Sequence, residues 1–283
     1  MIAAASRSPG PGGNLVEAAL ALRSLGRLEE ALEMVSGLKE FSADGQILRA
    51  DLQIDLGRIQ DAVSSYSTVL AFEGHHVYAQ YNLAKCLCRL GRWEAAAEAF
   101  RKVLISDPHR DDARIGLGDS LLQLNRAEEA LSCFNACWSE VFHVRALFGK
   151  AVALQLLGRL DEAAVAYERL LALDPSAEEA FANLIALSVE RLDMDAVHRY
   201  SLRLLELSPQ SAIALQGLTV AALEREEYEM AAGYFQHLAM APDECLPEQA
   251  DRRGTIQYRP NPAALARLVD LQPKAERIAV DAR

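Results

Sequence analysis

The chain has 283 residues, of which 51% are apolar and 24% charged, with 29 basic and 40 acidic side chains. No stretch approaches the roughly 18 consecutive apolar residues that a membrane-spanning helix needs, so we expect no membrane partner. Non-specific affinity for nucleic acid comes from Lys and Arg side chains that neutralise phosphates, and a formal net charge of −11 argues against it. Nucleic acid is therefore not expected as a principal partner.

The first residues and the cysteines indicate the cellular setting. Residues 1–11 contain Pro and Gly where a secretion signal would need an apolar run of roughly 7–15 residues, so we expect a disordered leader. Five cysteines are an odd and modest number for this length, which argues against a disulfide framework. The sequence therefore predicts a cytoplasmic protein.

A motif of the type Leu-Gly-Arg, followed by acidic residues and Ala, recurs along the chain with a period of about 34 residues. Its third residue falls at Arg27, Arg58, Arg92, Arg126 and Arg159. Prolines give an independent measure, since Pro108, Pro175 and Pro209 are separated by two periods and by one. Abundant Ala and Leu favour helices, so each repeat is expected to contain two amphipathic helices.

This period resembles that of the tetratricopeptide repeat family, whose unit is a helix-turn-helix of about 34 residues. Counted from the turn Gly, the repeats begin near residues 12, 43, 77, 111, 144, 178 and 212. The Ala that the family has at position 20 is present in six of the seven repeats, with Val197 as the exception. Stacking buries the apolar stripe of each unit against the next. The resemblance therefore implies an all-α fold, a right-handed superhelical α-solenoid of about seven repeats over residues 12–245.

Several repeats depart from the pattern, and we expect irregular packing at those joints. The interval from Arg27 to Arg58 is shorter than the later ones, which predicts a shortened junction around residues 41–45. The fourth repeat ends without Asp-Pro and has Trp138 and Phe142 where a polar turn is expected. Leu192 and Glu226 replace the turn Gly of the sixth and seventh repeats. The apolar joint at Trp138 is also where self-association would be sought.

Residues 246–283 follow the repeats as a tail. Asn261-Pro262 places an N-cap before a Pro at the first helical position, and the apolar residues that follow predict a helix over 261–271. From Asp251 onward the tail holds seven basic and four acidic residues, so it is basic while the rest of the chain is acidic. The tail is either a cap over the last apolar face or a basic segment that folds back along the solenoid.

The sequence contains none of the motifs that commonly carry catalysis or cofactor binding. It lacks Gly-x-Gly-x-x-Gly, Gly-x-Ser-x-Gly, His-Glu-x-x-His and a phosphate-binding loop. Cys133 and Cys137 share a helix face at a spacing that suits a metal, but no His stands at ligand spacing on the same helix. We therefore expect no enzyme activity, no cofactor and no metal site.

The resemblance implies a binding surface on the concave face, which the first helix of each repeat lines. Partners in the family contact side chains near positions 2, 5, 6, 9, 12 and 13. Two tyrosines, an Asn and two cations fall there in the third repeat, and aromatic residues and Arg dominate binding energies at interfaces. The predicted partner-binding residues are Tyr78, Tyr81, Asn82, Lys85, Arg89, Asp119, Arg145, Phe148 and Asn183.

Two more specific patterns of the family are incomplete in this chain. Position 5 has no Lys, with which one subclass grips the terminal carboxylate of chaperone tails. Asn82 and Asn183 resemble the groove asparagines of repeat arrays in glycosyltransferases, which hold a peptide backbone, but two positions do not make that ladder. The alternative is that these side chains are ordinary solvent-facing groove residues without a dedicated ligand.

The predicted function is a non-catalytic scaffold or adaptor that captures a protein or extended peptide segment in its concave groove. Helices that are already folded lose little freedom on binding, which favours this mechanism. One alternative is a regulatory sensor of a short peptide, with the basic tail as an internal competitor. Another is a substrate-recruitment subunit of a separately encoded transferase.

Overall fold

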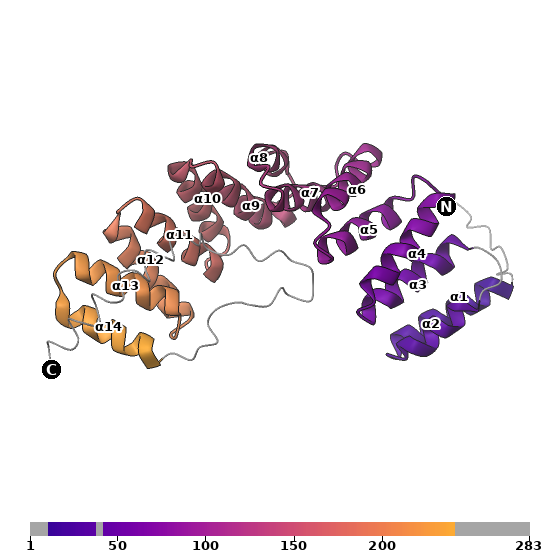
Figure 1. Ribbon diagram of the computed structural model, residues 1–283, viewed down its shortest axis with the longest axis horizontal. Helices are drawn as coiled ribbons and strands as arrows, with labels where there is room; N and C mark the ends of the chain where they lie inside the picture. The colour runs from indigo at the N-terminus through magenta and orange to yellow at the C-terminus, as the bar shows by residue number, and fades with distance from the viewer. Residues whose placement is uncertain (1–10, 38–41, 241–283) are drawn as a thin grey trace, which may run out of the picture. The chain divides into compact units, whose positions relative to one another are not determined.

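A computed structural model describes residues 11–37 and 42–240 of the chain (Figure 1). The described residues form two compact units, which are divided between Arg126 and Ala127. Residues 1–10 of the predicted leader (1–11) and the predicted tail (246–283), with its helix at 261–271, lie outside the described residues. Pro11, the last residue of the predicted leader, is instead the first residue of a helix.

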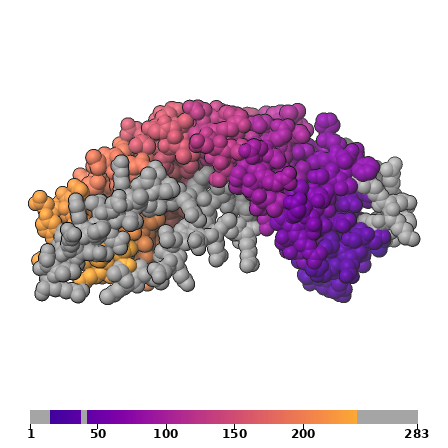
Figure 2. Space-filling view, viewed as in Figure 1, coloured from indigo at the N-terminus to yellow at the C-terminus, as the bar shows by residue number. Residues whose placement is uncertain are grey.

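The first unit is a stack of helices in which each helix packs against its neighbours in the sequence (Figure 1). Its helices are α1 (Pro11–Ser24), α2 (Leu28–Ser36), α3 (Ala43–Asp55), α4 (Ile59–Phe72), α5 (Val77–Arg89), α6 (Trp93–Ser106) and α7 (Asp111–Gln123). Figure 2 shows the surface of this unit, coloured from indigo to magenta, in space-filling form.

The second unit has the same construction. Its helices are α8 (Ala127–Asn135), η1 (Glu140–Phe142), α9 (His143–Leu156), α10 (Leu160–Leu173), α11 (Glu178–Glu190), α12 (Met194–Leu207), α13 (Ala212–Glu224) and α14 (Tyr228–Met240). The described residues of both units form helices and no strand, which confirms the predicted all-α fold of stacked helices. Within these same ranges, no helix combines the length and the apolar character that crossing a membrane requires.

The joint between α8 and α9 is irregular, as its composition predicts. The 3₁₀ helix η1 occupies it in place of a simple turn. Trp138 and Val141 are 63% and 85% exposed beside this short helix. Trp138 and Val141 therefore face solvent in the second unit, whereas Phe142 is half-buried.

The turns between paired helices share one hydrogen-bond pattern whether or not they contain Gly. At Gly57, with a φ of 76°, the backbone N–H of Arg58 donates to the carbonyl of Gln53 at 2.7 Å. At Leu192, with a φ of 57°, the N–H of Asp193 donates to the carbonyl of Ser188 at 2.9 Å. The turn at Leu192 therefore keeps the regular hydrogen bonds, although irregularity was expected there. Leu192 itself takes the left-handed backbone conformation that Gly adopts more readily.

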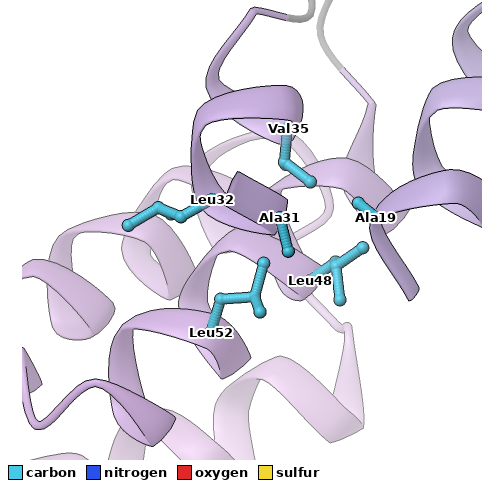
Figure 3. Packing of buried hydrophobic residues seen from close by; sticks show 6 residues of the cluster. All are labelled: Ala19, Ala31, Leu32, Val35, Leu48 and Leu52. Carbon is cyan, nitrogen blue, oxygen red and sulfur yellow. The ribbon is translucent and has the colours of Figure 1, made fainter. Parts of the chain in front are cut away.

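Alanine permits the close approach of helices in the core of the first unit (Figure 3). Ala19 of α1 and Ala31 of α2 have no exposed surface, and both pack in one cluster with Leu48 and Leu52 of α3. Ala31 stands at position 20 of its repeat, where the sequence predicts a small residue for this reason. A larger side chain there would force α1 and α2 apart, because protein interiors are close-packed.

Two glycines receive the aromatic side chain of the preceding helix. A Cβ atom added to Gly116 of α7 would lie 2.7 Å from Cε1 of Phe100, a side chain of α6. A Cβ atom added to Gly149 of α9 would lie 2.8 Å from Cε2 of Phe134 and closer still to two other ring atoms. Each Gly thus forms a socket for a buried ring within its own unit.

Three departures from the repeat pattern meet at one place in the second unit. Ile185 and Val197 stand at positions 8 and 20 of the sixth repeat, where most of the repeats have Ala. Ser201 stands at position 24, where five of the seven repeats have Tyr or Phe. A Cβ atom on Gly217 would lie 3.1 Å from Ile185 Cγ2 and 3.4 Å from Val197 Cγ1, and it would overlap Ser201 Oγ. Extra volume at two positions therefore replaces the missing ring, so the departures compensate one another.

Candidate partner-binding surface

Five of the predicted partner-binding residues lie together on α5. Tyr78, Tyr81, Asn82, Lys85 and Arg89 recur at spacings of three and four residues, which places them on one side of this helix. Lys85 and Arg89 are exposed and Tyr78 is 46% exposed, while Tyr81 and Asn82 are half-buried. The first unit therefore presents two cations and two aromatic rings on a continuous helical face.

Tyr78 is anchored by a carboxylate of the preceding first helix. Its hydroxyl donates to Asp51 Oδ2 at 3.1 Å, and the hydroxyl of buried Tyr66 donates to Oδ1 of the same carboxylate. Arg23 of α1 lies 3.7 Å from Asp51 Oδ2 and donates through Nε to Asp55 at 2.7 Å. Partial burial, together with the charge of Asp51, raises the pKa of the Tyr78 hydroxyl, so Tyr78 stays protonated as a donor.

Tyr81 is a packed ring with cations beside it. It meets Phe100 of α6 edge-on, with ring centroids 5.9 Å apart and an interplanar angle of 66°. The guanidinium of Arg110 lies 4.4 Å from the Tyr81 centroid, and Lys85 Nζ lies 5.7 Å from it. Arg110 is itself oriented by a hydrogen bond from its Nε to Asp112 Oδ1 at 3.0 Å. The edge contact and the cations fix the orientation of the tyrosine.

The contact of Arg110 with the Tyr81 ring was not predicted from the sequence. It precedes the first residue of α7 and so lies outside the positions at which the family binds partners. Its role depends on the path of the turn between α6 and α7, for which the repeat pattern gives no signal. The Arg23–Asp51 contact could have been found, because the two residues carry opposite charges at inner positions of successive first helices.

The two groove asparagines make the same local hydrogen bond. Asn82 Nδ2 donates to the carbonyl of Tyr78 at 3.0 Å, and Asn183 Nδ2 donates to the carbonyl of Glu179 at 2.8 Å. Each amide thus satisfies one of its donors within its own helix. Asn183 is only 2% exposed, whereas Asn82 is half-buried.

The remaining predicted residues are divided between the units. Asp119 of α7 is 5% exposed and lies in the first unit with the α5 residues. Arg145 of α9 is exposed in the second unit, where Phe148 meets Tyr167 edge-on at a centroid distance of 5.7 Å. The structure therefore brings together the α5 set within the first unit, while Arg145, Phe148 and Asn183 belong to the second.

The cysteines show the environment of structural thiols. Burial raises the pKa of the Cys86 and Cys88 thiols to about 11. Cys88 Sγ also lies 3.5 Å from Ser120 Oγ of α7. Cys137 Sγ donates to the carbonyl of Cys133 at 3.5 Å. In the part of the chain that the structure describes, no group of three His, Cys, Asp or Glu side chains is placed to hold a metal ion.

Three segments of the chain match family models of the tetratricopeptide repeat. Two matches cover residues 47–111 and 88–137, and a third covers residues 144–187. These segments include α5 and its neighbours in the first unit, as well as α9 in the second. The comparison with curated proteins found no match.

Solved structures share the fold at low sequence identity. A tetratricopeptide repeat protein from Parabacteroides merdae is 19% identical, with a TM-score of 0.61 over 92% of this chain and 98% of that one. The C-terminal part of a repeat-containing protein from Cytophaga hutchinsonii is 14% identical, with a TM-score of 0.68 over 86% and 100% of the two chains. YrrB, described as having an unusual peptide-binding site, is 20% identical, with a TM-score of 0.55 over 66% and 95%.

Proposed function

We propose that this chain, which belongs to the tetratricopeptide repeat family, is a non-catalytic cytoplasmic scaffold that captures a segment of a partner protein on the exposed side of α5. We take α1, α3, α5, α7, α9, α11 and α13 as the first helices of seven repeats. Binding of protein segments is the common use of such stacked helices, and YrrB is described as having a peptide-binding site.

One observation carries the proposal: Lys85 and Arg89 are exposed cations that form no salt bridge with any described residue. Some other cations of the first unit are paired, as Arg23 is with Asp55 and Arg58 is with Glu29. A surface cation without a salt bridge can meet a partner's carboxylate or carbonyl oxygen. The fixed ring of Tyr81 beside Lys85 supplies an apolar contact at little cost in conformational entropy.

The test compares capture of partner proteins by the natural chain and by the double variant Lys85→Ala/Arg89→Ala. Both side chains are exposed, so the variant should keep the helix content and unfolding midpoint of the natural chain. Partners retained by affinity capture and identified by mass spectrometry should lose at least about tenfold in affinity, since two exposed polar anchors at a binding centre contribute about 1.4 kcal/mol or more.

Arg58→Ala is the matched control, because Arg58 is exposed in the same unit but its salt bridge with Glu29 lies at the turn after α3. The control should bind the same partners as the natural chain. If the double variant captures every partner as well as the control does, the α5 surface is not the binding site. Tyr81→Ala is less informative, because it also removes the packing of Tyr81 against Phe100.

A further inference from the structure

A recess opens in the first unit, apart from Lys85 and Arg89 of the α5 surface. It has a volume of about 490 Å³ and lies between the C-terminal ends of α4 and α6, with α5 as its floor. Apolar walls come from Leu70 of α4, Val77 and Leu83 of α5, and Ile105 of α6. This volume falls within the range of natural ligand pockets.

The recess and the two cations of the α5 partner surface lie on different sides of the same helix. Successive residues of an α-helix are rotated by about 100°, so Gln80 and Leu83, which line the recess, lie roughly 120–180° around the helix axis from Lys85 and Arg89. Val77 is nearer to the partner surface, because it lies one turn before Tyr81. A segment bound in the recess would therefore leave Lys85 and Arg89 accessible.

Small side chains create the opening. Ser67, Ala71 and Gly74 line it at the end of α4, and Ser106 lines it at the end of α6. Because these side chains are small, they do not fill the space between the ends of α4 and α6. Ile105 stands at the edge of this space and is 80% exposed, the highest value among the large apolar side chains described in the first unit.

The charges of the recess indicate what would complement it. Lys102 and His75 line it, and no carboxylate stands among its described lining residues, although the chain as a whole carries a net charge of −11. A carboxylate beside Lys102 would gain a charge-assisted hydrogen bond, while an apolar side chain would bury Ile105 and the walls. A basic partner would find no carboxylate to pair with among these lining residues.

We propose that this recess binds a short segment of a partner protein that inserts one large apolar side chain and places a carboxylate beside Lys102. The inference does not depend on the α5 surface, since the two sites share a helix but no side chain. Together they allow the chain to hold two protein segments at once, which is what an adaptor requires.

The test starts from a library of random twelve-residue peptides displayed on phage and selected against the full chain. Enriched peptides are synthesised, and their affinities are measured by fluorescence anisotropy against the natural chain and its variants. We expect enriched peptides to carry a large apolar residue close to Asp or Glu. Ile105→Glu should weaken their binding at least tenfold, and Lys102→Glu should weaken it at least threefold.

Two controls separate this site from other effects. Leu173→Glu places the same charge at a 56% exposed apolar position at the end of α10, in the second unit, and should leave peptide affinity unchanged. Lys85→Ala/Arg89→Ala should also leave it unchanged. The high exposure of Ile105 makes loss of folding an unexpected outcome of Ile105→Glu, and circular dichroism of the variant checks this directly.

Three results would overturn the proposal. The first is that no enriched peptide loses affinity for Ile105→Glu, and the second is that the affected peptides carry no carboxylate. The third is that Lys102→Glu binds them as tightly as the natural chain does. Peptides that depend only on Lys85 and Arg89 would support the α5 surface and refute this one, so the two proposals can fail separately.

Discussion

Gly149 offers a stringent test of how the rings and sockets hold the second unit together. Phe134 is 3% exposed, and a Cβ atom at residue 149 would lie 2.8 Å from its Cε2 atom and closer still to Cε1 and Cζ. Gly149→Ala therefore forces the ring or the helix to move. The same substitution also improves helix propensity, so the two effects oppose each other.

Their magnitudes decide the sign. Overpacking of a close-packed core costs about 1–3 kcal/mol, and overlap with three ring atoms puts this site near the upper end. Replacing Gly by Ala inside a helix gains about 1 kcal/mol. Gly149→Ala should therefore lower the free energy of unfolding by about 2 kcal/mol.

Gly233→Ala is the matched control, because Gly233 lies inside α14 of the same unit and an added Cβ atom would meet nothing within 4 Å. Only the helix-propensity effect remains, so this variant should gain up to about 1 kcal/mol. Urea unfolding followed by far-ultraviolet circular dichroism measures both. The identical chemical change should thus destabilise at one site and stabilise at the other.

A double-mutant cycle with Phe134→Leu tests the cause. The shorter side chain removes the ring atoms that overlap a Cβ atom at residue 149, so the cost of Gly149→Ala should fall by at least about 1 kcal/mol in that background. An unchanged cost would show that the destabilisation does not come from the ring. A neutral or stabilising Gly149→Ala in the natural chain would refute the socket itself.

Four further predictions concern individual residues. Ser201→Ala should stabilise by about 1 kcal/mol in urea unfolding, because the buried Ser201 hydroxyl has no hydrogen-bond partner among the described residues, and a loss of stability would contradict this. Glu226 and Gly158 both hold a positive φ, which Gly adopts at lower cost than other residues. Glu226→Gly should therefore stabilise the folded chain by about 0.5–1 kcal/mol, and Gly158→Ala should destabilise it by about 1 kcal/mol. Shifts of the two melting temperatures in the same direction would contradict this. Burial raises the pKa values of the Cys86 and Cys88 thiols to about 11, so their alkylation should be slow near neutral pH and should become faster as pH rises towards 11. Peptide mapping measures the rate at each thiol. An alkylation rate that stops rising near pH 9 would indicate a thiol with an ordinary pKa. Because their folded-state pKa values are raised from 9.0, the stability linked to these thiols should be lost as pH rises from 9 through 11.

The sequence was a good guide wherever a rule acts between neighbours along the chain. Ala at position 20 marks a helix contact, and Ala31, Ala62 and Ala96 are all without exposed surface. The composition of the joint around Trp138 predicts irregular packing, and η1 is found there. The expected irregularity at Leu192 does not appear in the turn, because the backbone accepts a left-handed residue to preserve its hydrogen bonds.

The candidate surface was only partly predictable, for a physical reason. A helical period is enough to place Tyr78, Lys85 and Arg89 on one side of α5. It does not tell which of the cations are already paired, since pairing depends on the distance between helices. Nor does it tell that the Tyr81 ring is held by Phe100 and Arg110, which come from the next helix and the turn after it.

The family and the helical fold can be read from the sequence alone, because a repeat is specified by a few small and apolar residues whose spacing is visible along the chain. The compensation among Ile185, Val197 and Ser201 around Gly217 is visible only in three dimensions. The same holds for the recess that opens between α4 and α6 beside Lys102. Both depend on how closely particular helices approach, which follows from the packing of side chains that are distant in the sequence.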